Sequence, residues 1–116
     1  MLSIPDDVAV YLCTGVSDMR LGFDRLAEMI RAELKVTPIS GGLFVFFSRN
    51  RKKVRVLYWD RDGYALWMKR LEAGAYKVEQ HQGYETITGV DLREIFLGMD
   101  LSRIKFRKSA ENGCFS

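Results

Sequence analysis

Histidine, cysteine and proline are scarce in this sequence, whose 116 residues include one histidine, two cysteines and two prolines. Two cysteines cannot define a disulfide scaffold. Cys13 and Cys114 also lie too far from each other and from His81 to form a paired zinc-ligand motif. We therefore expect free thiols and no metal site. His81 lies in a polar segment without a positioned cysteine or serine partner, which argues against nucleophilic catalysis.

Long apolar runs are also missing. The longest, Leu43–Phe47, has the length of a strand and is far too short to span a membrane. The N-terminus carries Asp6 and Asp7 where a signal peptide has basic residues. With 47% hydrophobic and 28% charged residues, the composition is that of a globular protein. We expect a cytoplasmic protein without a membrane partner, with a single domain over residues 1–106 and a loose C-terminal tail over residues 107–116.

The first third of the chain predicts one strand and one helix. Residues 8–13 are rich in β-formers and end at a Thr-Gly pair. Residues 17–35 follow with apolar side chains at helical spacing, and Ser17 or Asp18 can cap the first turn. Pro38 and the glycines after it end the helix. The predicted apolar stripe consists of Phe23, Leu26, Ala27, Ile30 and Leu34.

The remainder predicts a β-meander and a second helix. Four β-rich runs follow one another with tight turns between them, at residues 42–48, 52–60, 64–71 and 75–80. Thr88 and Asp91 then have the spacing of a capping box at the start of a helix over residues 88–100. The order β-α-β-β-β-β-α predicts an α+β fold, an antiparallel meander of about four to five strands covered by two helices.

Acidic residues suggest one catalytic alternative, a metal-dependent nuclease that uses Asp18, Asp60 and Asp62. However, Asp60-Arg61-Asp62-Gly63 between two strands is ordinary turn chemistry, in which aspartate accepts local backbone bonds and Gly63 supplies a positive φ. No glycine-rich phosphate loop opens a helix. The residues therefore favour a protein that is not an enzyme and that needs no cofactor.

Positive charge is concentrated locally although the net charge is only +3. Residues 49–55 hold five cations and no anion, and residues 103–108 hold four. Such clusters attract phosphate more strongly than the average charge suggests. The structural alternative is that the first cluster is a solvated turn that keeps a sheet edge from pairing with other chains.

Three segments together resemble a known family: 14–27, with Thr-Gly-Val-Ser-Asp-Met-Arg; 41–74, with Trp-Asp-Arg-Asp-Gly and Lys-Arg-Leu-Glu-Ala-Gly; and 92–100. They resemble the TnpB-type accessory protein of insertion-sequence-66 transposable elements, over roughly residues 4–101. The resemblance implies a protein needed for transposition without established catalytic activity of its own, beside a separate transposase. After Gly74 many relatives have an aromatic residue and Trp-Pro, which this chain lacks, so no role of that motif transfers.

Two hypotheses follow for the function. In the first, the protein helps the transposase to engage DNA through non-specific phosphate contacts. In the second, it is a pure interaction module that docks on the transposase or on a second copy of itself, with aromatic anchors. The predicted DNA contacts are Arg49, Arg51, Lys52, Lys53, Arg55, Lys69 and Arg70, and the predicted partner anchors are Trp59, Tyr64 and Trp67.

The resemblance also marks Asp18 and Arg20, for which two interpretations are open. In a structural interpretation Asp18 caps the first helix and Arg20 pairs with a carboxylate or carbonyl elsewhere in the domain. In a functional interpretation Arg20 binds a phosphate and Asp18 orients it. The junction between a strand and a helix favours the cap.

Overall fold

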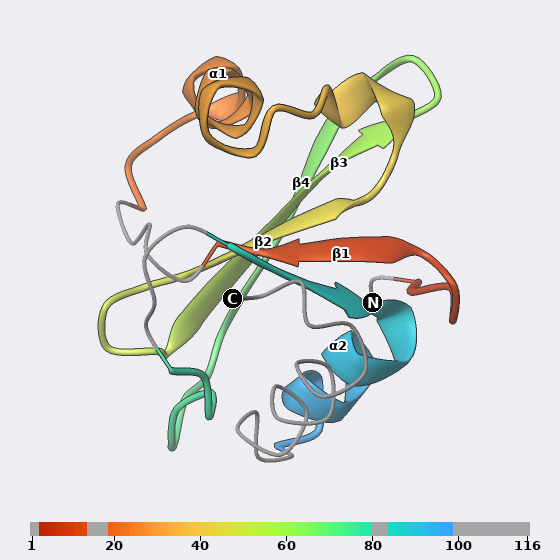
Figure 1. Cartoon of the computed structure of the whole chain (residues 1–116). Coiled ribbons are helices and arrows are strands. Elements are labelled where there is room, and N and C mark those ends of the chain that lie inside the picture. Colours follow the sequence, from red (N-terminus) through yellow and green to blue (C-terminus); the bar gives the residue numbers. More distant parts are fainter. Residues whose placement is uncertain (1–2, 14–18, 80–83, 99–116) are drawn as a thin grey trace.

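The chain folds into a five-stranded sheet with one helix on each face (Figure 1). A computed structural model describes residues 3–13, 19–79 and 84–98. The predicted α+β class and the order β-α-β-β-β-β-α are confirmed, with one added 3-10 turn. The elements are β1 (Ala9–Leu12), α1 (Phe23–Leu34), η1 (Pro38–Ser40), β2 (Leu43–Phe47), β3 (Lys53–Asp60), β4 (Gly63–Arg70), β5 (Glu85–Thr88) and α2 (Gly89–Phe96).

The sheet order is β4-β3-β2-β1-β5, and this sheet is mixed rather than wholly antiparallel. β2, β3 and β4 form the predicted antiparallel hairpins, but β1 lies parallel to β2, with Val10 opposite Leu43. The reason is the helical connection: the chain leaves β1, passes through α1 and returns beside β1 in the same direction. β5 closes the other side by pairing antiparallel with β1.

The predicted strand over residues 75–80 is wrong for the part that is described. Residues 75–79 have no strand structure. Tyr76 and Val78 are nevertheless buried, and the Tyr76 amide donates to the Arg51 carbonyl at 2.8 Å. The apolar alternation was therefore a sign of core packing by an irregular segment. The strand that completes the sheet comes later, at Glu85–Thr88, and lies at the far edge from β4.

Two hydrophobic cores lie on opposite faces of the sheet. The core under α2 takes in Val45, Phe47, Val54 and Val56, whereas the core under α1 takes in Phe44, Phe46 and Leu57. All five residues of β2 are buried, because this central strand faces a core on both sides. The unbroken apolar run Leu43–Phe47 is the sequence signature of that position.

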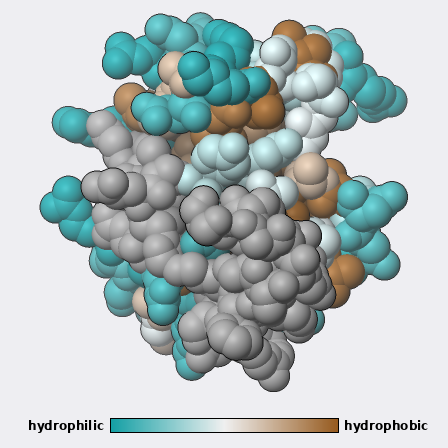
Figure 2. All heavy atoms as spheres, in the orientation of Figure 1, coloured by the Kyte–Doolittle hydropathy of each residue, from teal (hydrophilic) through white to brown (hydrophobic). Residues whose placement is uncertain are grey.

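α1 begins later than the sequence predicts. Its N-cap is Gly22, which contributes no side-chain hydrogen bond, so the predicted cap by Ser17 or Asp18 is wrong. Those two residues lie outside the described part of the chain. The helix ends at Leu34, and its C-cap residue Lys35 adopts a left-handed conformation with φ of 61°. Hydrophilic residues cover most of the surface around α1 at the top of Figure 2. The buried face is formed by Leu26, Ala27, Ile30 and Leu34, four of the five predicted residues.

α2 starts where the sequence predicts. The Asp91 amide donates to the Thr88 hydroxyl at 3.2 Å, and the Asp91 carboxylate accepts from the Thr88 amide at 3.3 Å, which confirms the capping box. The helix ends at Phe96, before the predicted end at residue 100. Across the described residues, neither helix has the length and apolarity that crossing a membrane requires. The predicted tail, residues 107–116, lies outside the described residues.

Gly89, the first residue of α2, offers a test of how the N-terminal segment packs. A Cβ atom at this position would lie 1.8 Å from the Pro5 carbonyl oxygen, so the backbone would have to move. We expect Gly89→Ala to lower the free energy of unfolding by about 1–3 kcal/mol in urea denaturation, as overpacking does. Gly63→Ala is the control, because nothing lies within 4 Å of its Cβ position. Equal stability of both variants would contradict this packing.

Candidate functional site

The basic turn between β2 and β3, residues 49–52, is confirmed as a turn and is held by its own side chains. The Asn50 side-chain oxygen accepts hydrogen bonds from the Ser48 hydroxyl at 2.8 Å and from the Lys52 amide at 3.1 Å. The Ser48 hydroxyl in turn accepts from the Lys53 amide at 3.0 Å. Local bonds of this type fix a turn without a glycine. The cations here therefore project from an ordered backbone.

Arg51 is occupied within the protein. Its Nε donates to the Val78 carbonyl at 3.1 Å and its Nη1 donates to the Ser48 carbonyl at 2.8 Å. Its backbone is left-handed, with φ of 61°, and its carbonyl accepts from the Tyr76 amide. Partial burial lowers the pKa of Arg51, but a guanidinium stays charged at neutral pH. Arg51 therefore fastens the segment 75–79 to the basic turn.

Arg55 is a buried cation in the middle of β3. Its side chain is 3% exposed and lies on the α1 face, with Phe46 and Met68 as its neighbours in register. Its Nη1 donates to the Leu21 carbonyl at 2.6 Å. A charge is retained in such a place only when hydrogen bonds compensate its lost hydration. Arg55 therefore holds the segment before α1 against the sheet.

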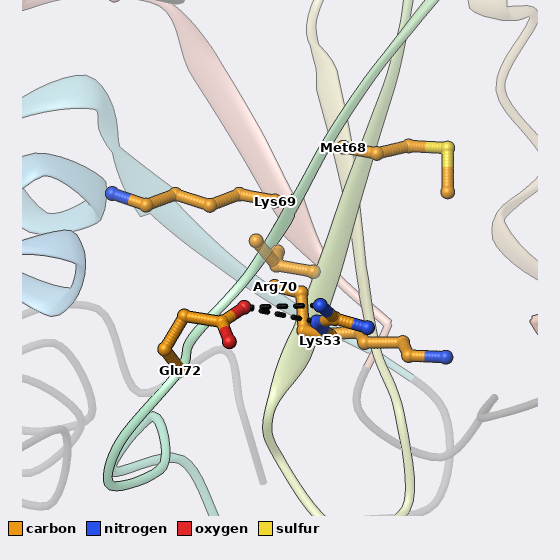
Figure 3. Close-up of a pocket in the computed structure, with 6 residues that line it drawn as sticks. Lys53, Met68, Lys69, Arg70 and Glu72 are labelled. Carbon is orange, nitrogen blue, oxygen red and sulfur yellow. Dashed lines mark hydrogen bonds and ion pairs between the residues drawn. The ribbon is translucent and has the colours of Figure 1, made fainter.

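The other five predicted cations are exposed. Lys53 and Arg70 are opposite each other on β3 and β4, on the α1 face, whereas Lys69 points to the other side (Figure 3). Arg70 pairs with Glu72, whose Oε2 lies 3.1 Å from both Nε and Nη2. A shallow hollow of about 360 Å³ lies between these side chains. We call this surface the basic end; it consists of Arg49, Lys52, Lys53, Lys69 and Arg70.

The three predicted aromatic anchors do not form one patch. Trp59 and Tyr64 are cross-strand neighbours, and their rings meet edge to face with centroids 5.1 Å apart. Trp67 is on the opposite face of β4, where its ring lies 5.5 Å from that of Phe96 and packs on the core under α2. All three are partly buried. A partner could meet Trp59 and Tyr64 together, but not Trp67 with them.

The acidic turn between β3 and β4 is also confirmed, with one difference. The positive φ belongs to Arg61, at 57°, and not to Gly63. Asp60 and Asp62 are exposed, and Asp60 lies 3.8 Å from the Arg61 guanidinium. Within residues 3–13, 19–79 and 84–98, no three His, Cys, Asp or Glu side chains gather to hold a metal ion. Asp18 lies outside these residues, so the three-aspartate site stays a prediction.

The remaining candidates are Cys13, Arg20, His81 and Cys114. Cys13 is a free thiol at 2% exposure, and burial raises its pKa to about 12, so it is protonated at neutral pH. Arg20 is exposed at a turn before α1. His81 and Cys114 lie outside the described residues.

Comparison with known proteins shows which family this chain belongs to. The model of a family described as IS66 Orf2 like protein matches residues 8–106. The chain belongs to this family. This chain is 35% identical over 101 residues to the uncharacterized protein y4hO of Sinorhizobium fredii. The aligned residues cover 86% of this chain and 88% of the relative. It is 27% identical over 97 residues to y4jC of the same organism, with 83% of each chain covered. No solved structure matches this chain.

Membership of the IS66 Orf2-like family confirms the resemblance found in the sequence. It also supports the assignment of the chain as a transposition accessory protein. The sequence does not show that the cations of residues 49–55 have two different roles, with Arg51 and Arg55 bonded inside the protein and the other three exposed. A signal for Arg55 was present: it alternates with Val54 and Val56 in a strand that neighbours the fully apolar run Leu43–Phe47. For Arg51 no local signal existed, because its acceptor Val78 is 27 residues away.

The structural role of Arg55 can be tested against a neighbour on the same strand and face. We expect Arg55→Ala to lower the free energy of unfolding by about 1.5–3 kcal/mol in urea denaturation, since the Leu21 carbonyl loses a charged donor. The matched control, Lys53→Ala, removes an exposed cation and should cost less than about 0.5 kcal/mol. An Arg55→Ala protein of unchanged stability would contradict the structural role.

Proposed function

We propose that this IS66 Orf2-like protein is a non-catalytic transposition accessory that binds the DNA backbone through its basic end and thereby helps the transposase to engage DNA. The observation that carries the proposal is the basic end itself. Its five exposed cations come from one turn and two neighbouring strands, whereas the two arginines between them serve the fold. Lysine and arginine side chains of this kind contact phosphates without reading sequence.

The ordered backbone of the turn over residues 49–52 favours DNA binding. The turn is held by the Ser48 and Asn50 side chains, so little backbone freedom is lost when Arg49 and Lys52 meet a phosphate. Arg70 already holds a carboxylate, that of Glu72, in a position from which the guanidinium can exchange it for a phosphate oxygen. The basic end carries cations on both faces of the hairpin, which suits straddling a phosphate backbone.

The proposal assigns no chemical step to the protein. Asp60 and Asp62 are exposed side chains of a turn, and the Cys13 thiol is buried and protonated. Chemistry belongs, in this proposal, to the transposase of the same element. A second candidate function is docking on that transposase, and the Trp59–Tyr64 pair favours it because two partly exposed aromatic rings lie side by side at the far end of the same hairpin.

Salt dependence is the direct test of DNA binding. Each phosphate contact releases counterions, so four or five contacts predict a slope of about −4 for log K against log salt on duplex DNA. We expect the double variant Lys52→Glu, Lys53→Glu to bind a fluorescent duplex at least about tenfold more weakly, with a shallower slope. The matched control is Arg25→Glu, Arg31→Glu, which reverses two exposed cations of α1.

Four outcomes would decide against the proposal. Binding that ignores salt, or no binding at low salt, would sink it. If the Lys52→Glu, Lys53→Glu protein keeps DNA binding but no longer captures the transposase, the docking function takes its place. Strand nicking that needs Mg²⁺ or Mn²⁺ and is lost in Asp60→Asn would instead make the protein a nuclease.

A further inference from the structure

β4 is an outer strand of the sheet, and the middle of its sequence has none of the features that protect an edge from pairing. No strand lies beside it among residues 3–13, 19–79 and 84–98. Its eight residues pair with β3 in one continuous register, without a bulge. It contains no proline, and its middle, residues 64–68, contains no charge. Edges of this length are normally blunted by such devices or are used for pairing.

The hydrogen bonds at the end of β4 show which of its residues direct their backbone amide and carbonyl groups toward β3. The Leu71 amide donates to the Lys52 carbonyl at 2.8 Å, so the alternation of an antiparallel ladder directs the odd-numbered residues of β4 toward β3. The bond from the Ser48 amide to the Lys53 carbonyl, at 3.0 Å, gives the consistent phase for β2 and β3. The outward amides and carbonyls are therefore those of Tyr64, Leu66, Met68 and Arg70.

Charge is arranged with opposite signs at the two ends of this edge. Asp60 and Asp62 precede it, and Lys69 and Arg70 end it. An antiparallel copy of the same strand would bring each acidic end against a basic end, whereas a parallel copy would bring like charges together. A register centred on Leu66 opposite its own copy places Arg70 opposite Asp62. In this register the backbone hydrogen bonds between the copies join only even-numbered residues, which are the ones with outward backbone groups.

We propose that β4 pairs antiparallel with β4 of a second copy of this chain, with Leu66 on the two-fold axis, to give a continuous ten-stranded sheet. Met68, which is 60% exposed, then lies opposite Tyr64 of the second copy and is covered by it. The pairing shares Arg70 with the basic end but does not involve Lys52 and Lys53, so the double variant at these two lysines tests DNA binding without changing the β4 edge. The interface is isologous, as expected of a two-fold dimer.

Analytical ultracentrifugation of the full chain over a range of concentrations tests the dimer. Met68→Pro removes an outward amide and leaves the bonds between β3 and β4 intact, so we expect a folded monomer. Met68→Ala keeps the amide and should still dimerise. Circular dichroism reports whether each variant is folded. A wild-type protein that is monomeric at all concentrations, or a folded Met68→Pro dimer, would overturn the proposal.

Charge exchange tests the register without touching the backbone. Arg70→Glu and Asp62→Arg should each weaken dimerisation by about tenfold, because each puts like charges opposite one another twice. The double variant Arg70→Glu, Asp62→Arg restores attraction and should recover the dimer. Failure of the double variant to recover would overturn this register. Duplex binding by Met68→Pro is a separate readout, which should persist because this variant keeps all five cations of the basic end.

Discussion

The burial of β2 on both faces is the constraint on which the rest of the structure depends. Five consecutive apolar side chains, Leu43–Phe47, cannot be hidden by one layer, so the sheet needs a helix on each side. β1 and β3 flank this strand, and the crossover through α1 makes β1 and β2 a parallel pair in an otherwise antiparallel sheet. β4 and β5 are left at the edges. The exposed charge of the hairpin is consequently concentrated away from the centre of the sheet.

The same constraint explains why a basic segment has two kinds of cation. Arg55 is on the strand next to β2 and lies under α1, where it can remain charged only by donating to a backbone carbonyl such as that of Leu21. Arg51 serves the end of the sheet, where it closes the irregular segment 75–79 over the core. Both arginines stabilise the surface that presents Lys52 and Lys53. Cations with a structural role and cations that we propose to bind DNA therefore alternate within residues 49–55.

Features set by local chemistry could be predicted from the sequence. The capping box of Thr88 and Asp91, the two hairpin turns and the apolar stripe of α1 all depend on residues within one or two turns of each other. The predicted start of α1 is too early because Ser17 and Asp18 are residue types that often cap helices, whereas the apolar face that α1 buries begins only at Leu26. The predicted strand over residues 75–80 is wrong because Tyr76 and Val78 have the alternate spacing of buried strand residues, whereas they pack into the core from an irregular segment.

The candidate site was predictable only in part, for a related reason. The sequence located the basic turn, but the structural roles of Arg51 and Arg55 depend on carbonyls from distant segments, at Val78 and Leu21. The split of the aromatic anchors, by contrast, follows from strand periodicity once the register is known, since Tyr64 and Trp67 are an odd number of residues apart. Long-range register, rather than residue type, decides which side chains meet.

The central claim is that stability and binding are divided among neighbouring cations, and a paired alanine scan tests it most directly. Unfolding free energy and duplex affinity would be measured for single alanine variants of the five cations in residues 49–55. We predict that the variants at Arg51 and Arg55 lose stability, and that those at Arg49, Lys52 and Lys53 keep stability and lose affinity. Affinity unchanged at all three exposed positions, or stability unchanged at both arginines, would contradict the claim.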